Sequence, residues 1–159
     1  MARASAVDDP LITSWGRLVE AYSFLERRLG ASLEATCGIP STWFEVLLRL
    51  ARAEDGQLSM GPLAEEVALT TGGITRLLDR MIKAGYVERR PGTTDRRVAF
   101  AVLTPAGREK IEEAAAVHAR DLQEIFAVFS SAERGTLDDL LDRLRTDSGH
   151  PRQERRSGT

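Results

Sequence analysis

The chain has 159 residues, of which 42% are hydrophobic and 29% are charged, and its formal net charge at pH 7 is −2. This length suits one domain and allows a buried core without disulfides or a structural metal. A single cysteine excludes an intrachain disulfide framework and favours a reducing compartment, so we expect a cytoplasmic protein. The first ten residues lack the apolar core of a signal peptide, and no run of about 18 apolar residues predicts a membrane span.

The charges are segregated along the chain. Residues 70–97 carry seven basic and three acidic side chains, whereas residues 105–147 carry six basic and ten acidic side chains. The middle segment therefore favours a polyanionic partner, although the whole chain is slightly negative.

A long helix is predicted for residues 8–35. Its apolar residues recur every third or fourth position, as in a helix with one apolar face. They are Ile12, Trp15, Leu18, Tyr22, Leu25, Leu29 and Leu33. Gly38 is the expected stop, and Pro40 stands at a new start.

Two shorter helices are predicted next. The first spans residues 41–53, with Ser41 as a candidate N-cap, and residues 54–57 predict a turn. Ser59 is the expected N-cap of the second, which carries Leu63, Ala64 and Val67. Pro62 falls in its first turn, where a missing N–H costs little.

The clearest helix spans residues 70–85, with Thr70 as a natural N-cap and Gly85 as a natural stop. Its apolar stripe consists of Ile74, Leu77, Leu78, Met81 and Ile82. The opposite face carries Thr75, Arg76, Asp79, Arg80 and Lys83. Gly72 and Gly73 each cost up to about 1 kcal/mol against alanine in a helix interior. They indicate either a frayed helix start or a backbone that must approach another group closely.

Two strands are predicted at residues 86–90 and 98–103, joined by the segment PGTTDRR. Arg89 and Arg90 alternate along the first strand, so we expect one to face a partner and the other to pair with an acid of its own chain. Arg96 and Arg97 lie at the tip, where Asp95 is close enough to hold Arg97 through a charge-assisted hydrogen bond.

Two more helices are predicted from Pro105 onward. The first has an apolar seam of Ile111, Ala115, His118, Leu122, Ile125 and Phe129. The second begins with a capping box, in which Ser130 is the cap and Glu133 is its partner, and carries Leu137, Leu140, Leu141 and Leu144. Residues 1–7 and 148–159 are expected to be disordered tails.

The order of these elements predicts a mainly α fold with a small β-hairpin wing. A short helix, a turn and an amphipathic helix form a helix-turn-helix, whose second helix enters a DNA major groove, and the hairpin makes it winged. Hydroxyls, arginines and a helix N-terminus suit phosphates and base edges. The predicted DNA-binding residues are Thr70, Thr71, Gly72, Gly73, Thr75, Arg76, Arg80, Asp95, Arg96 and Arg97.

Residues 43–107 resemble the MarR family of winged helix-turn-helix transcriptional regulators. The segment ITRLLDRMIKAGYVERR, followed by DRRVAFAVLTPAG, is similar to that family's recognition helix, wing and entry to the next helix. Its most specific residues are Asp95, Arg96, Arg97, Leu103 and Thr104. The resemblance implies a homodimer that binds pseudo-palindromic double-stranded DNA. We expect one domain over residues 8–147, with a DNA-binding lobe at 41–104 and dimerisation helices at 8–35 and 105–147.

The resemblance also implies a small aromatic or phenolic effector bound between the dimerisation helices and the lobe. The candidate ligand-binding residues, each of which core packing also explains, are Trp15, Tyr22, Trp43, Phe44, Glu45 and Arg89. Trp15 and Arg89 match the urate-responsive branch of the family, whereas Glu45 and Leu77 depart from its pattern of Asp and Arg. These departures weigh against urate and leave an anionic aromatic ligand open.

The favoured function is a transcriptional repressor relieved by a ligand. Open alternatives are an activator, a thiol-based redox regulator, and a winged-helix protein-interaction module without specific DNA binding. Cys37 ends its helix with no nearby base or cation in the sequence to favour a thiolate, and His118 is expected to pack on the seam. We find no motif typical of an enzyme, and one cysteine with two histidines makes a poor zinc set, so we expect no cofactor or metal.

Overall fold

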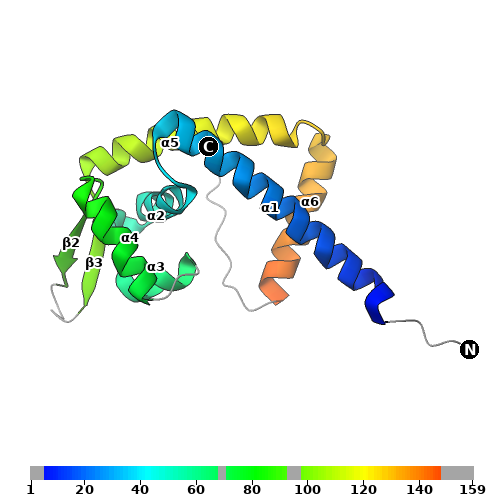
Figure 1. Cartoon of the computed structure of the whole chain (residues 1–159), viewed down its shortest axis with the longest axis horizontal. Helices are drawn as coiled ribbons and strands as arrows, with labels where there is room; N and C mark the ends of the chain where they lie inside the picture. The colour runs from blue at the N-terminus through cyan, green and yellow to red at the C-terminus, as the bar shows by residue number, and fades with distance from the viewer. Residues whose placement is uncertain (1–5, 68–70, 93–97, 148–159) are drawn as a thin grey trace, which may run out of the picture. The chain divides into compact units, whose positions relative to one another are not determined.

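The computed structural model describes residues 6–67, 71–92 and 98–147 (Figure 1). The described residues up to Ala119 form one compact unit and those from Arg120 form a second, and each is described by itself. The elements are η1 (Ala6–Asp8), α1 (Pro10–Cys37), α2 (Ser41–Arg52), η2 (Glu54–Gly56), β1 (Gln57–Ser59), α3 (Met60–Glu66), α4 (Thr71–Lys83), β2 (Val87–Pro91), β3 (Ala99–Leu103), α5 (Pro105–Phe126) and α6 (Ser131–Asp147). The mainly α fold with a small sheet is confirmed, and the single domain over 8–147 stays a prediction.

Local chemistry sets the two ends of α1. Asp9 is its N-cap and accepts a hydrogen bond from the N–H of Leu11 at 2.7 Å, and Pro10 occupies the first turn. The helix runs to Cys37 and ends at Gly38, whose φ of 69° is the left-handed conformation that glycine adopts most easily. The stop at Gly38 is confirmed, and the helix lies two residues later than predicted at both ends.

Ser41 does not cap α2, contrary to the prediction. Pro40 holds the N-cap position in an extended conformation, and its carbonyl oxygen accepts hydrogen bonds from the N–H groups of Trp43 and Phe44 at 2.9 and 3.1 Å. Ser41 is already the first helical residue. With Pro40 at the N-cap, the helix starts one residue earlier than a serine cap would place it.

The wing is part of a three-stranded antiparallel sheet in the order β1-β3-β2, whereas the sequence predicted two strands. The missed strand is β1, which pairs Gln57 with Val102 and Ser59 with Phe100. Ser59, predicted to cap a helix, is the last residue of β1 and directly precedes α3. Three residues are too short to show the alternation that marks a strand in sequence, so only the pairing with β3 defines β1.

One hydrophobic core fills the first unit. It includes the predicted stripe of α4, because Ile74, Leu77, Leu78 and Met81 are buried and Ile82 is partly buried against them. The other elements contribute, among others, Leu33, Phe44, Leu47, Leu50, Leu63, Val87, Ala101 and Ile111. The helix-turn-helix, the wing and the start of α5 are therefore packed on shared apolar contacts. Among the described residues, no helix is both long and apolar enough to cross a membrane.

Glycine ends α4 as predicted. Gly85 has a φ of 81°, its N–H donates to the carbonyl of Ile82 at 2.9 Å, and the N–H of Tyr86 donates to the carbonyl of Met81 at 3.1 Å. These two bonds form a Schellman motif, which satisfies carbonyls at the helix end and turns the chain into β2.

Thr104 connects this turn to α5. Its N–H donates to the carbonyl of Tyr86 at 3.1 Å, its hydroxyl donates to the carbonyl of Gly85 at 2.7 Å, and its Oγ1 accepts from the N–H of Gly107 at 2.9 Å. Gly107 lies so close to Tyr86 that a Cβ on it would be 2.0 Å from that carbonyl oxygen. We call these four residues, Gly85, Tyr86, Thr104 and Gly107, the junction. These contacts give a structural reason for the threonine at position 104 and the glycine at position 107.

In the second unit, the predicted capping box of α6 is confirmed. The N–H and hydroxyl of Ser130 donate to Glu133 Oε2 at 2.8 and 2.7 Å, and the N–H of Glu133 donates to Ser130 Oγ at 3.3 Å. The preceding helix α5 ends at Phe126, so Phe129, predicted on its seam, lies in the connection instead. Arg134 closes this connection by donating to the carbonyl of Phe129 at 3.1 Å.

This capping box predicts a pH dependence. The hydroxyl and then the N–H of Ser130 lower the pKa of Glu133 below its ordinary value of 4.5. The unfolded chain therefore holds the proton more tightly, so the stabilisation of α6 is complete above that value and is lost as pH falls through the lowered pKa. We expect Ser130→Ala to raise the pKa of Glu133 toward its ordinary value in an NMR titration of its carboxylate. An identical titration in both proteins would contradict the capping role.

Candidate nucleic-acid interface

The outward face of α4 is basic and exposed. The helix packs against α3 on one side and against β2 on another (Figure 1). Its buried stripe fixes its rotation, and the residues turned outward are Gly72, Arg76, Asp79, Arg80 and Lys83. Arg76 and Arg80 are four residues apart and so project from the same side. The helix therefore presents guanidinium groups one turn apart, spaced to meet phosphates or guanine edges.

The other predicted DNA-binding residues have different placements. Thr75 lies in the middle of α4 and is half-buried, and Gly73 is also half-buried near the helix start. Thr71 begins α4, and nothing is described of its side chain. Thr70 and the wing-tip residues Asp95, Arg96 and Arg97 lie outside the described residues, so the expected bond between Asp95 and Arg97 stays a prediction.

Both arginines of β2 pair with acids, whereas the sequence led us to expect one pair. Arg89 Nη2 lies 3.0 Å from Asp79 Oδ1 of α4, and Arg90 pairs with Glu88 on its own strand. Neighbours on a strand point to opposite faces, so Arg89 leaves the strand on the side of α4 and Arg90 on the other side. The sequence could not show this, because Asp79 and Arg89 belong to different elements.

The six predicted ligand-binding residues meet different partners. Trp43 packs edge-on against Tyr86 with ring centroids 6.1 Å apart, and Phe44 belongs to the core, 4.6 Å from the ring of His118. Glu45 pairs with Arg49 at 3.5 Å, and Arg89 pairs with Asp79. Trp15 and Tyr22 are exposed on α1. For Phe44, the alternative of core packing is the better description.

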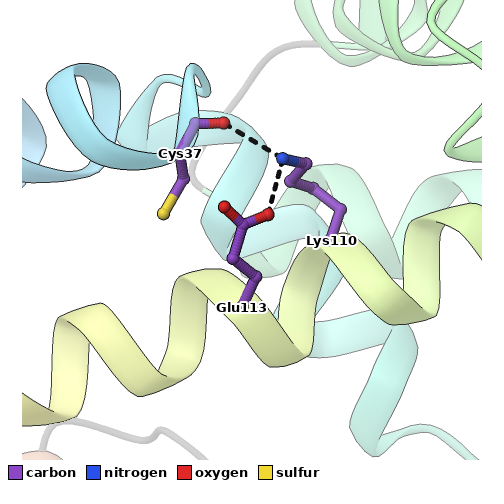
Figure 2. Close-up of polar contacts among 3 residues, drawn as sticks. All are labelled: Cys37, Lys110 and Glu113. Atoms are coloured by element: carbon purple, nitrogen blue, oxygen red, sulfur yellow. Dashed lines mark hydrogen bonds and ion pairs between the residues drawn. The ribbon is translucent and has the colours of Figure 1, made fainter.

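Cys37 has a cation near its backbone carbonyl, a contact that the sequence did not show. Lys110 Nζ donates to the carbonyl oxygen of Cys37 at 3.2 Å and to Glu113 Oε2 at 2.7 Å, and the bond to Glu113 raises the pKa of Lys110. Figure 2 shows the carbonyl of Cys37, rather than its sulfur, turned toward the ammonium group. The thiol is buried, which is typical of a structural cysteine, and the lysine stabilises the C-terminal end of α1. Sequence reasoning missed this contact because 73 residues separate the partners.

A second exposed surface is apolar. In the C-terminal half of α1, Leu29, Leu33 and Cys37 are buried. The same helical stripe continues toward the N-terminus, where its residues are exposed, namely Leu11, Trp15, Leu18 and Tyr22. In the second unit, α6 likewise exposes Leu140, Leu141 and Leu144. Exposed apolar stripes of this kind are typical of an interface with another chain.

Comparisons with known proteins agree with this geometry. A family model described as "MarR family" matches residues 38–98. The chain is 33% identical over 117 residues to the uncharacterized HTH-type transcriptional regulator YdgJ of Bacillus subtilis, covering 74% of this chain and 70% of that protein. The chain belongs to the MarR family. The resemblance stated from the recognition helix and wing is confirmed, and the MarR-family chain is a transcriptional regulator.

Solved structures of MarR-family proteins show the same fold. Sco3205 of Streptomyces coelicolor, solved in complex with DNA, superposes with a TM-score of 0.80 at 25% identity, covering 95% of this chain and 93% of that chain. A mutant MarR of Escherichia coli complexed with operator DNA gives a TM-score of 0.74 at 27% identity, covering 89% and 99% of the two chains. The winged helix-turn-helix architecture is therefore confirmed for this MarR-family chain.

Proposed function

We propose that this protein is a homodimeric regulator that reads a pseudo-palindromic operator with α4 and its wing. The observation that carries the proposal is the outward face of α4, where Arg76 and Arg80 project together from a helix whose other face is buried. Arginine forms bidentate hydrogen bonds with guanine in the major groove and ion pairs with phosphates. The DNA complexes of Sco3205 and of the Escherichia coli MarR mutant support this use of the fold.

The homodimer is supported by the exposed part of the α1 stripe. Trp15 is 65% exposed and Tyr22 is 64% exposed, although both continue the line of residues that is buried further along the helix. A second copy of the chain covers this surface in our proposal, and a two-fold axis then presents two copies of α4 to successive major grooves. The predicted operator therefore has half-sites about one helical turn apart.

We also propose that a small aromatic or phenolic ligand relieves repression. The junction ties the C-terminal end of α4 and the base of the wing to the first turn of α5 through Thr104. A ligand that binds more tightly at one spacing of the dimer's two DNA-binding lobes would shift the dimer toward that spacing. The resulting change in DNA affinity is limited by the difference in the ligand's affinity for the two spacings. The predicted ligand residues Trp15, Tyr22, Trp43, Glu45 and Arg89 remain candidates.

The direct test is selection of bound duplexes from a random library, followed by fluorescence anisotropy on the selected DNA at several salt concentrations. We expect Arg76→Ala with Arg80→Ala to lower the specific affinity at least about tenfold, because each base contact by arginine is worth about 1–3 kcal/mol. Each lost phosphate contact lowers the salt slope by about 1. Arg143→Ala on the exposed part of α6 is the matched control and should bind as the parent does.

Two outcomes would overturn the proposal. Failure to enrich any sequence would exclude an operator-reading function. Binding that changes little with salt would favour a winged helix that recognises a protein, because several phosphate contacts make DNA binding fall steeply with salt. Enrichment of a site with two related halves would support both the reading function and the dimer.

A further inference from the structure

Asp79 is an unexpected residue on the outward face of α4. It is the only acid of that helix in the sequence, it is exposed, and it follows Arg76 by three residues and precedes Lys83 by four. These spacings place it beside both cations on the helix surface. A carboxylate there repels phosphate and lowers the positive potential of the face proposed to read DNA.

The carboxylate has a partner on another element. Arg89 Nη2 of β2 donates to Asp79 Oδ1 at 3.0 Å, so the contact joins the recognition helix to the wing. Arg89 is itself held in register, because it lies opposite Ala101 on the central strand β3 and shares a strand face with the buried Val87. The backbones of both residues are thus held in place, that of Arg89 by the sheet and that of Asp79 by a helix whose opposite stripe is buried.

We propose that Asp79 and Arg89 are positioning residues that fix the wing strand at one distance and angle from the recognition helix. The proposal rests on the proposed DNA-binding function. Side chains of the pair are 57% and 40% exposed, so its effect on global stability is small. Its effect on recognition is larger in our proposal, because α4 and the wing must reach their contacts at the same time and a loose wing loses one of them.

The test uses the opposite signs of two effects. Asp79→Asn removes a negative charge from the basic face, so electrostatics alone predicts tighter binding to every DNA. Positioning predicts weaker binding to the selected operator, by about threefold to tenfold, with binding to random DNA unchanged or tighter. Glu88→Gln is the matched control, because it removes an acid of the same wing that pairs with Arg90 and has no part in the link to α4.

A charge swap separates positioning from charge. Asp79→Arg and Arg89→Asp each place like charges together and should lower operator affinity, whereas the double variant restores the pair at unchanged net charge and should recover most of it. Circular dichroism and unfolding midpoints establish that each variant is folded. Operator binding that is equal or tighter in Asp79→Asn, or a double variant no better than the singles, would overturn the proposal. A parent protein without operator specificity would instead refute the proposed function itself, and the positioning role with it.

Discussion

Gly107→Ala is expected to lower the free energy of unfolding by about 2–3 kcal/mol, as overpacking of a close-packed site does. The new Cβ would lie 2.0 Å from the carbonyl oxygen of Tyr86 and 2.9 Å from Leu103 Cδ1. The first of these neighbours is backbone and accepts a hydrogen bond from the N–H of Thr104, so it cannot move without breaking the junction. Urea unfolding followed by far-UV circular dichroism measures the loss.

Gly72→Ala provides the contrasting control. Gly72 lies near the start of α4, and a Cβ there would meet nothing within 4 Å. Alanine in a helix is favoured over glycine by up to about 1 kcal/mol, less near an end, so this variant should be as stable as the parent or slightly more stable. If Gly107→Ala lowers the free energy of unfolding and Gly72→Ala does not, the loss comes from the close approach of α5 to Tyr86 and not from replacing a glycine as such. A Gly107→Ala protein of unchanged stability would refute the close packing of Gly107 against Tyr86 in the junction.

Elements with a strong local signal were predictable from the sequence. The stripe of α4, the stop at Gly85 and the capping box of Ser130 and Glu133 depend on residues within a few positions of one another. The winged helix-turn-helix followed because the order of such elements leaves few ways to bury their apolar faces. The outward face of α4 was predictable for the same reason, since burial of one stripe determines which residues point outward.

Contacts between distant segments were not predictable. The strand β1 exists through its pairing with β3, and its three residues show no pattern of their own. Lys110 reaches the end of α1 across 73 residues, and Arg89 reaches Asp79 across a helix end and a turn. Sequence spacing shows which residues share an element, but the distance between elements depends on how the core packs. The sites that join elements, the junction and the Asp79–Arg89 pair, therefore required the structure.

Trp15→Glu is expected to weaken dimerisation at least about 30-fold, because loss of an aromatic anchor from an interface costs about 2 kcal/mol or more. Trp15 lies on the α1 stripe that is buried at Leu29 and Leu33 and exposed toward the N-terminus. A glutamate there would have to be desolvated in the proposed interface. Sedimentation velocity over a concentration series measures the dissociation constant, and circular dichroism shows whether the separated chains stay folded.

Phe24→Glu is a matched control on the same helix. Phe24 is 57% exposed, close to the 65% of Trp15, but it stands nine residues along α1 and therefore about 180° around the helix. If the interface follows the stripe, the Phe24 variant should remain a dimer. The same pair of variants separates dimerisation from DNA reading, because the Trp15 variant should keep its weak affinity for a single half-site while losing its preference for two correctly spaced half-sites. Dissociation in both variants would show that the interface surrounds α1, and dissociation in neither would place the dimer contacts elsewhere.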